Sequence, residues 1–284
     1  MISAAQLFGA IEAGGTKFVC GVGTGPHDLG TARIPTTSPD ETVAAAIEWL
    51  REHSGGGLSG VGIGSFGPVD LRRGWITSTP KAAWRDYDLA GTVSRALGIP
   101  VSLDTDVNAA VLGEARWGAG RDLANCLYLT IGTGIGGGAI AGGVIVHGLT
   151  HPEMGHIRIP HDRGADPFEG CCPYHGDCLE GLASGPAIRG RWGMPGEALP
   201  PDHPAWALEA RYLALGIANF ICMLSPEKVL IGGGVMRQQQ LFGMIRAEVE
   251  RILAGYVRRL PRMEPPALGE LSGVLGALAL AERT

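Results

Sequence analysis

The sequence predicts an α/β fold, and two observations lead to this prediction. Short apolar segments of strand character alternate along the 284-residue chain with longer segments of helical periodicity. The construction strand, glycine turn, strand also occurs twice, first around Gly14 and again around Thr133. A repeated unit of this kind indicates an internal duplication, with two similar lobes that face each other.

Ordinary start and stop signals bound the predicted elements. The helix at 39–53 opens with acidic residues and ends before consecutive glycines, and Gly98 and Pro100 stop the helix at 88–97. The predicted strands are 7–12, 18–23, 61–64, 101–104, 126–131, 135–141 and 229–231. The predicted helices are 39–53, 88–97, 108–117, 204–224 and 239–253.

Composition limits the possible classes of function. A net charge of −5 and the lack of any Lys/Arg run argue against a nucleic-acid-binding surface. No apolar run reaches the roughly 20 residues that a membrane helix requires, so we expect no membrane partner. The N-terminal residues MISAAQLFGA do not resemble a secretory signal, which places the chain in the reducing cytoplasm, where disulfides are rare.

Three glycine-rich turns follow predicted strands and offer backbone amides to a ligand. The first, 13–17, adds the hydroxyl of Thr16 and the ammonium group of Lys17, so it could cradle a phosphate. Alone this signal is weak, because hairpin turns often carry glycine for conformational reasons only. The second, 132–134, repeats the construction, and the third, 232–234, would let an adenosine lie flat on the backbone. Together the turns favour nucleotide binding.

Asp104, Thr105, Asp106 and Asn108 lie where a predicted strand ends and a helix begins. This end of a strand is where α/β folds usually place their reactive groups. An acidic residue here could simply cap the helix. Two acids and an amide exceed what a cap requires, so the pattern favours a catalytic carboxylate.

A stretch rich in His and Cys shows a pattern typical of a zinc site. Cys172, His175 and Cys178 follow the spacing C-x-x-H-x-x-C, and His156 supplies a more distant fourth ligand. Two thiolates and two imidazoles can complete a tetrahedral structural zinc site. A local disulfide between Cys172 and Cys178 is the alternative, and Cys171 could take the place of Cys172 as a ligand.

Six motifs in order make the chain similar to the ROK family, and the segments EAGGTKF, STPK (78–81), DTDVN and CPYHGDCLEG make it most similar, within the family, to bacterial fructokinases. The motifs are IEAGGTK (11–17), DTDVNAAVLGE (104–114), IGTGIGGG (131–138), HPEMGHI (151–157), CLEGLASGPAI (178–188) and IGGGV (231–235). The resemblance covers essentially the whole chain. It implies an actin/hexokinase-like (ribonuclease H-like) duplicated fold, with two lobes around a central cleft. We expect an N-terminal lobe at 1–117 and a C-terminal lobe at 118–284, with the C-terminal helix free to return to the N-terminal lobe.

The resemblance also implies a role for each site residue. Asp106 matches the general base that takes the proton from the sugar hydroxyl, and Glu12 matches a magnesium ligand. The nucleotide would contact Gly14, Gly15, Thr16, Lys17, Gly132, Thr133, Gly134, Gly185, Pro186, Gly232, Gly233 and Gly234. The sugar would contact Gly67, Pro68, Thr105, Asp106, Glu153, His156 and Glu180. Zinc, bound by His156, Cys172, His175 and Cys178, would fix the orientation of a sugar-binding loop.

The function implied by the resemblance is the phosphorylation of D-fructose to D-fructose 6-phosphate by MgATP, in the cytoplasm and by a homodimer. The chain departs from the wider family in three places. Glu12 stands where Asp is usual, the zinc loop is C-x-x-H-x-x-C instead of C-x-C with a distant third Cys, and Thr105 replaces an Asn typical of glucokinases. The last departure weakens the case for glucose.

Two alternatives to a fructokinase stay open. One is a kinase for mannose, glucose or N-acetylglucosamine, which differs only in the sugar pocket. The other is a sugar-sensing regulator of the same family. Such regulators carry an N-terminal helix-turn-helix, for which we expect no room before the strand that starts at Leu7.

Overall fold

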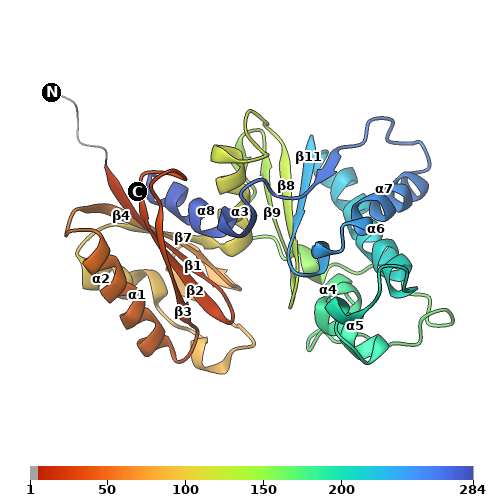
Figure 1. Cartoon of the computed structure of the whole chain (residues 1–284), viewed down its shortest axis with the longest axis horizontal. Helices are drawn as coiled ribbons and strands as arrows, with labels where there is room; N and C mark the ends of the chain where they lie inside the picture. The colour runs from red at the N-terminus through yellow and green to blue at the C-terminus, as the bar shows by residue number, and fades with distance from the viewer. Residues whose placement is uncertain (1–5, 284) are drawn as a thin grey trace. The chain divides into compact units, whose positions relative to one another are not determined.

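The computed structural model describes residues 6–283 and divides into two compact units. The first unit comprises Met1–Asp122, Ile145–Pro152 and Ala267–Thr284. The second comprises Leu123–Val144 and Glu153–Pro266. Each unit is built around one five-stranded sheet (Figure 1).

The sheet of the first unit has the strand order β3-β2-β1-β4-β7. Its strands are β1 (Leu7–Ala13), β2 (Lys17–Gly23), β3 (Gly30–Pro35), β4 (Leu58–Ser65) and β7 (Val101–Thr105). β1 and β2 form an antiparallel hairpin around the first glycine turn, whereas β4 runs parallel to both β1 and β7. A small separate ribbon pairs β5 (Val69–Asp70) with β6 (Trp75–Ile76).

The sheet of the second unit repeats this plan, with the order β10-β9-β8-β11-β12. Its strands are β8 (Cys126–Ile131), β9 (Ile135–Ala141), β10 (Val144–Ile145), β11 (Lys228–Gly232) and β12 (Arg262–Glu264). β8 and β9 again form an antiparallel hairpin, around the second glycine turn, and β11 runs parallel to β8 and β12. The repeated topology confirms the predicted duplicated α/β fold.

Alternating residues of β1 and β2 divide the core of the first unit between two helical layers. Ile11 and Cys20 belong to one cluster, with α1 (Pro39–His53) and α2 (Leu89–Leu97). Ala10 and Val19 belong to the other, with α8 (Ser272–Ala281). α8 approaches β4 so closely that a Cβ at Gly62 would lie 1.8 Å from the carbonyl oxygen of Ala277.

The helix that carries Asp106 begins two residues earlier than the sequence predicted. α3 spans Asp106–Trp117, because the side chain of Thr105 caps it by accepting the N–H of Asn108 at 3.1 Å. Asp106 is therefore the first residue of the helix and follows directly on the end of β7.

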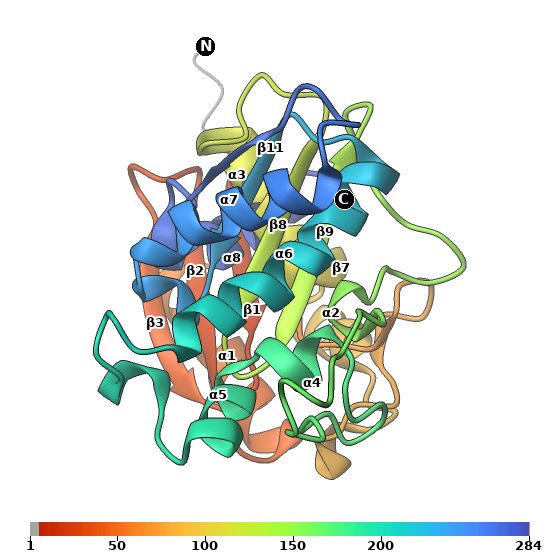
Figure 2. The same cartoon turned by 90° about the vertical axis from the view of Figure 1, so that its right-hand side faces the viewer.

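The helices of the second unit include a long apolar one that covers its sheet. α6 (Ala205–Leu224) and α7 (Gln240–Leu253) lie across β8 and β11 in Figure 2, and α4 (Leu179–Ala183) and α5 (Gly185–Trp192) are shorter. By length and composition α6 could cross a membrane, so the expectation that no apolar run is long enough was wrong. Its buried side chains include Trp206, Tyr212 and Phe220, as in a core helix.

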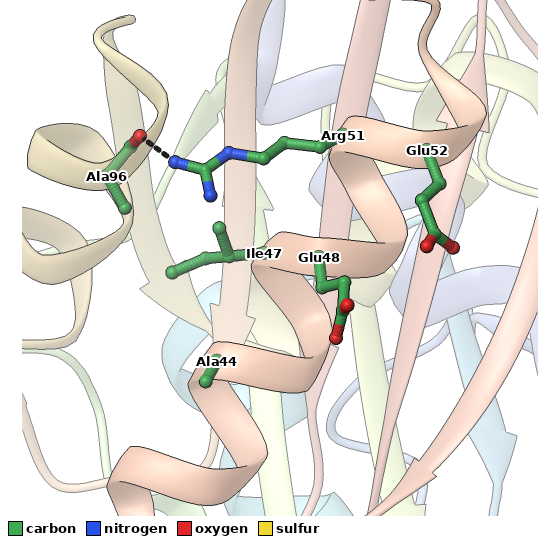
Figure 3. A pocket seen from close by; sticks show the side chains of 6 residues that line it. All are labelled: Ala44, Ile47, Glu48, Arg51, Glu52 and Ala96. Carbon is green, nitrogen blue, oxygen red and sulfur yellow. Dashed lines mark hydrogen bonds between the residues drawn. The ribbon is translucent and has the colours of Figure 1, made fainter.

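A hollow of about 550 Å³ lies on the surface of α1 and α2 (Figure 3). Arg51 spans it and donates to the carbonyl oxygen of Ala96. Its lining consists of Ala44, Ile47, Glu48, Arg51, Glu52 and Ala96, and no predicted site residue is among them.

Glu114 fixes the segment by which the chain returns to the first unit. This carboxylate on α3 is fully buried and accepts the N–H groups of Ala119 at 2.7 Å, Ala267 at 3.1 Å and Leu268 at 2.8 Å. It also accepts the hydroxyl of Ser272 at 2.8 Å, at the start of α8.

Glu114→Leu is expected to lower the free energy of unfolding by about 3 kcal/mol or more, because three backbone N–H groups and the buried hydroxyl of Ser272 lose their acceptor. Urea unfolding of the variant measures the loss. Glu48→Leu, on the exposed face of α1, removes the same charge and should change stability by less than about 0.5 kcal/mol. Equal stability of the two variants would show that Glu114 does not stabilise the segment by which the chain returns to the first unit.

Candidate functional site

The first glycine turn is closed by its own backbone. Gly14 donates its N–H to the carbonyl oxygen of Lys17 at 3.0 Å, and a Cβ on Gly14 would lie 2.6 Å from that oxygen. Thr16 and Lys17 are exposed at the tip. Lys81 lies against the turn, because its Cε would be 3.1 Å from a Cβ on Gly15. Lys81 therefore brings a second ammonium group to this turn, which the motif alone did not reveal.

Asp106 and Glu12 bring two carboxylates together in the first unit. Asp106 accepts the N–H of Val107 at 2.9 Å with its Oδ1. The pKa of Glu12 is raised to about 7, chiefly by burial and also by the negative charge of Asp106, while Lys17 and Arg33 act in the opposite direction. Glu12 Oε2 is buried and has no hydrogen-bond partner among residues 6–283. An orphaned carboxylate oxygen beside a second carboxylate fits a divalent cation.

Glu12→Gln is expected to stabilise the protein above pH 7. A carboxyl with a raised folded-state pKa ionises in the unfolded chain first, so stability falls as pH rises from about 4.5 to about 7 and then stays lower. The shift corresponds to about 3 kcal/mol, which the amide would recover at pH 8 and not at pH 4.

Urea unfolding at both pH values tests this expectation. Glu52→Gln, at an exposed position of α1, is the control, and it should change the stability by the same small amount at both pH values. A Glu12→Gln variant that is less stable than the wild type at pH 8 would contradict this expectation.

Three predicted nucleotide-binding segments meet in the second unit. Gly132 accepts the N–H of Gly185, at the start of α5, at 2.8 Å, and a Cβ on Gly132 would lie 3.9 Å from the backbone nitrogen of Gly234. Gly233 has a φ of +96°, and a Cβ there would lie 2.3 Å from the carbonyl oxygen of Ile131. Only glycine fits that position. Thr133 is exposed at the tip of its turn, and Pro186 follows Gly185 in the first turn of α5.

The predicted sugar contacts fall into two groups. Gly67, Pro68, Thr105 and Asp106 belong to the first unit, and Glu153, His156 and Glu180 to the second. The Gly67–Pro68 peptide is cis. Glu153 is exposed, whereas Glu180 Oε2 accepts the N–H of Ile135 at 2.9 Å. Glu180 thus braces the second glycine turn, where a Cβ on Gly134 would lie 2.6 Å from the same oxygen.

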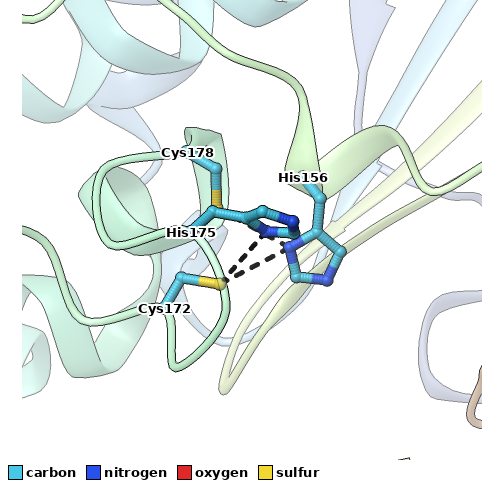
Figure 4. Close-up of side chains that lie close together, drawn as sticks. All are labelled: His156, Cys172, His175 and Cys178. Carbon is cyan, nitrogen blue, oxygen red and sulfur yellow. Dashed lines mark hydrogen bonds between the residues drawn. The ribbon is translucent and has the colours of Figure 1, made fainter. Parts of the chain in front are cut away.

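The four predicted zinc ligands form one cluster (Figure 4). One ligand atom from each of His156, Cys172, His175 and Cys178 lies within 4.8 Å of the others. Cys172 Sγ is 3.7 Å from His156 Nδ1 and 3.6 Å from His175 Nδ1, and Cys178 Sγ is 3.6 Å from His156 Nδ1. Zn–S bonds of about 2.3 Å and Zn–N bonds of about 2.1 Å at tetrahedral angles place such atoms about 3.6 Å apart. The donor set fits zinc.

The structure also decides between the alternatives for this cluster. All six cysteines are free, so the Cys172–Cys178 disulfide does not form. Cys171 is exposed, with its Sγ 3.7 Å from Ser184 Oγ, and it is Cys172 that joins the cluster. The pKa of the Cys178 thiol is raised to about 11, chiefly by burial and also by the neighbouring Cys172. With so high a pKa, the Cys178 thiol becomes a thiolate at neutral pH only with a bound cation.

The ion pairs that Asp177 forms beside the cluster were not predicted from the sequence. Asp177, between two of the ligands, pairs with Arg158 and with Arg163 Nη2 at 2.9 Å. His161 Nδ1 lies 3.3 Å from the same carboxylate. Hydrogen bonds from His161 and Arg163 lower the pKa of Asp177. Such outer partners orient metal ligands, but charged residues in a loop give no sequence signal of that role.

Comparisons with known proteins agree with this geometry. The model of the ROK family matches residues 8–284. The fructokinase of Pediococcus pentosaceus is 43% identical over 98% of each chain. The fructokinase of Zymomonas mobilis is 41% identical over 97% of this chain and 96% of its own. A solved ROK family glucokinase from Streptomyces griseus, in complex with glucose and AMPPNP, has a TM-score of 0.80 and 28% identity over 98% of this chain and 100% of its own. The chain therefore belongs to the ROK family.

Proposed function

We propose that this sugar kinase transfers the γ-phosphoryl group of MgATP to D-fructose and releases D-fructose 6-phosphate. The observation that carries the choice of sugar is the similarity to two fructokinases, at 43% and 41% identity over nearly the whole chain. The glucokinase structure, at 28% identity, favours glucose as the second candidate. We further propose that the enzyme is cytoplasmic and a homodimer.

Asp106 is the proposed general base. It stands at the end of β7, as the first residue of α3, where its carboxylate can accept the proton of the attacking sugar hydroxyl. Phosphoryl transfer passes through a loose transition state, so the protein mainly positions the reactants and stabilises charge. Glu153 and Glu180 would accept hydrogen bonds from other hydroxyl groups and so orient the sugar.

The nucleotide would bind to the glycine turns. The amides at 14–17 and 132–134 would hold the phosphates together with Lys17 and Thr133, and 185–186 and 232–234 would support the adenosine. Magnesium, when bound, neutralises charge on the β- and γ-phosphates. Its proposed protein ligand is Glu12, whose orphaned Oε2 fits that role. Zinc at the His156 cluster is proposed to be structural, because its four protein ligands close the site.

A coupled assay of ADP release, run with fructose, mannose, glucose and N-acetylglucosamine, tests the proposal. We expect the highest kcat/KM with fructose. A preference for glucose would overturn the choice of sugar, and no sugar-dependent ADP release would overturn the kinase. Light scattering on the same preparation tests the homodimer.

A further inference from the structure

The segment Ile145–Pro152 interrupts the second unit. The chain leaves that unit after Val144, runs through the first unit for this segment, and returns to the second at Glu153. Two histidines in this segment make hydrogen bonds near the proposed site. His147 bonds to Asp104, two residues before the proposed base, and His151 bonds to Val69, which directly follows the proposed sugar-contacting turn.

His147 binds the acidic residue that precedes the base. Its Nε2 lies 2.8 Å from Asp104 Oδ2, and the Asp104 side chain is only 4% exposed. A carboxylate only accepts hydrogen bonds, so Nε2 carries the proton. Asn108 donates its side-chain N–H to Asp104 Oδ1 at 2.8 Å. Asp104 and Asn108 flank Asp106, so this network fixes the turn from β7 into α3.

His151 has the opposite hydrogen-bonding role, because its Nε2 accepts a hydrogen bond. The backbone N–H of Val69 donates to His151 Nε2 at 2.9 Å, and His151 is only 6% exposed. Nε2 must therefore accept this hydrogen bond, so the ring proton is on Nδ1. Nδ1 lies 3.4 Å from the carbonyl oxygen of Pro152. Val69 directly follows Gly67 and Pro68, so His151 holds the end of that turn.

We propose that His147 and His151 are positioning residues, one for the base and the other for the sugar. The inference rests on the proposed function. His147 acts through Asp104 on the orientation of Asp106, and His151 acts through Val69 on the Gly67–Pro68 turn. The two histidines therefore control different kinetic constants. Loss of the His147 bond lowers kcat, and loss of the His151 bond raises KM for the sugar.

Leu and Gln variants at each position test the proposal, with the preferred hexose of the wild type as substrate. His147→Leu should lower kcat by about 10-fold or more, with the sugar KM within about threefold of wild type. His151→Leu should raise the sugar KM by about 10-fold or more, with kcat within about threefold. A Gln amide offers both a donor and an acceptor near the place of Nε2, so His147→Gln and His151→Gln should restore most of each loss. His27→Leu, at an exposed site, is the control and should change neither constant.

The outcomes distinguish a positioning role of the two histidines from a purely structural role and from a failure of the proposed function itself. Equal changes in kcat and KM for both Leu variants, with lower melting temperatures, would reduce the histidines to structural residues and overturn the inference. Leu variants with wild-type kinetics, or Gln variants no better than Leu, would overturn it as well. If the Leu variants do not fold, Asn variants replace them, because an Asn amide reaches the place of Nδ1 and not that of Nε2. A wild type that phosphorylates no hexose would overturn the proposed function and this inference with it, whereas an active wild type with unaffected variants would overturn the inference alone.

Discussion

Asp106→Asn is expected to lower kcat by about 10²–10⁴-fold, the usual contribution of a positioned general base. The amide cannot take the proton of the sugar hydroxyl. It can still accept the N–H of Val107, which Asp106 accepts now at 2.9 Å, so the start of α3 should keep its conformation. Binding of MgATP depends on other residues in this proposal, so its Kd should stay within about threefold of wild type. Steady-state kinetics and a nucleotide-binding titration on one preparation measure both quantities.

The matched control for this variant is Asp40→Asn. Asp40 is an exposed acid in the first turn of α1, so the control removes the same charge from the first turn of another helix in the same unit. It should leave kcat within about twofold of wild type. Near-normal turnover of Asp106→Asn would refute the assignment of the base, and a weakened Kd for MgATP would show that Asp106 serves the nucleotide instead.

The general architecture could be predicted because it depends on local patterns. The alternation of strands and helices and the two hairpins around glycine turns each have a short-range signal, and they gave the duplicated α/β fold. The start of α3 was misplaced, because Thr105 is a capping residue and the pattern of apolar residues does not show where the cap ends. The excursion of 145–152 into the first unit depends on hydrogen bonds between residues far apart in sequence, such as His151 with Val69, and so left no local signal.

The candidate site was predictable to a similar degree. The four zinc ligands follow a spacing that few other constraints produce, and the structure brings them together and selects Cys172 over Cys171. The place of Lys81 against the first glycine turn was not predicted, because no local pattern shows which distant loop residue packs beside that turn. Glu180 was predicted to contact the sugar, and its hydrogen bond with Ile135 was not predicted, because that contact depends on how α4 packs against β9.

Cys178→Ser is expected to abolish zinc binding and to raise the sugar KM by about 10-fold or more. Cys178 directly precedes α4, and Leu179, its first residue, donates its N–H to the carbonyl oxygen of Ile157 at 3.0 Å. The cluster thus joins the segment that carries Glu153 and His156 to the helix that carries Glu180. Without zinc these two carboxylates lose their fixed separation, so the sugar loses its orienting contacts.

The proposed nucleotide-binding segments at 132–134, 185–186 and 232–234 contact one another without any ligand of the cluster, so KM for ATP should stay within about threefold of wild type. Metal analysis and kinetics on the same preparation measure the three quantities. Cys171→Ser is the matched control, because this exposed neighbour stands outside the cluster and its variant should keep one zinc per chain and normal kinetics. Loss of zinc from Cys171→Ser would reverse the assignment of the ligand. A zinc-free Cys178→Ser enzyme with an unchanged sugar KM would show that the metal does not orient the sugar-binding carboxylates.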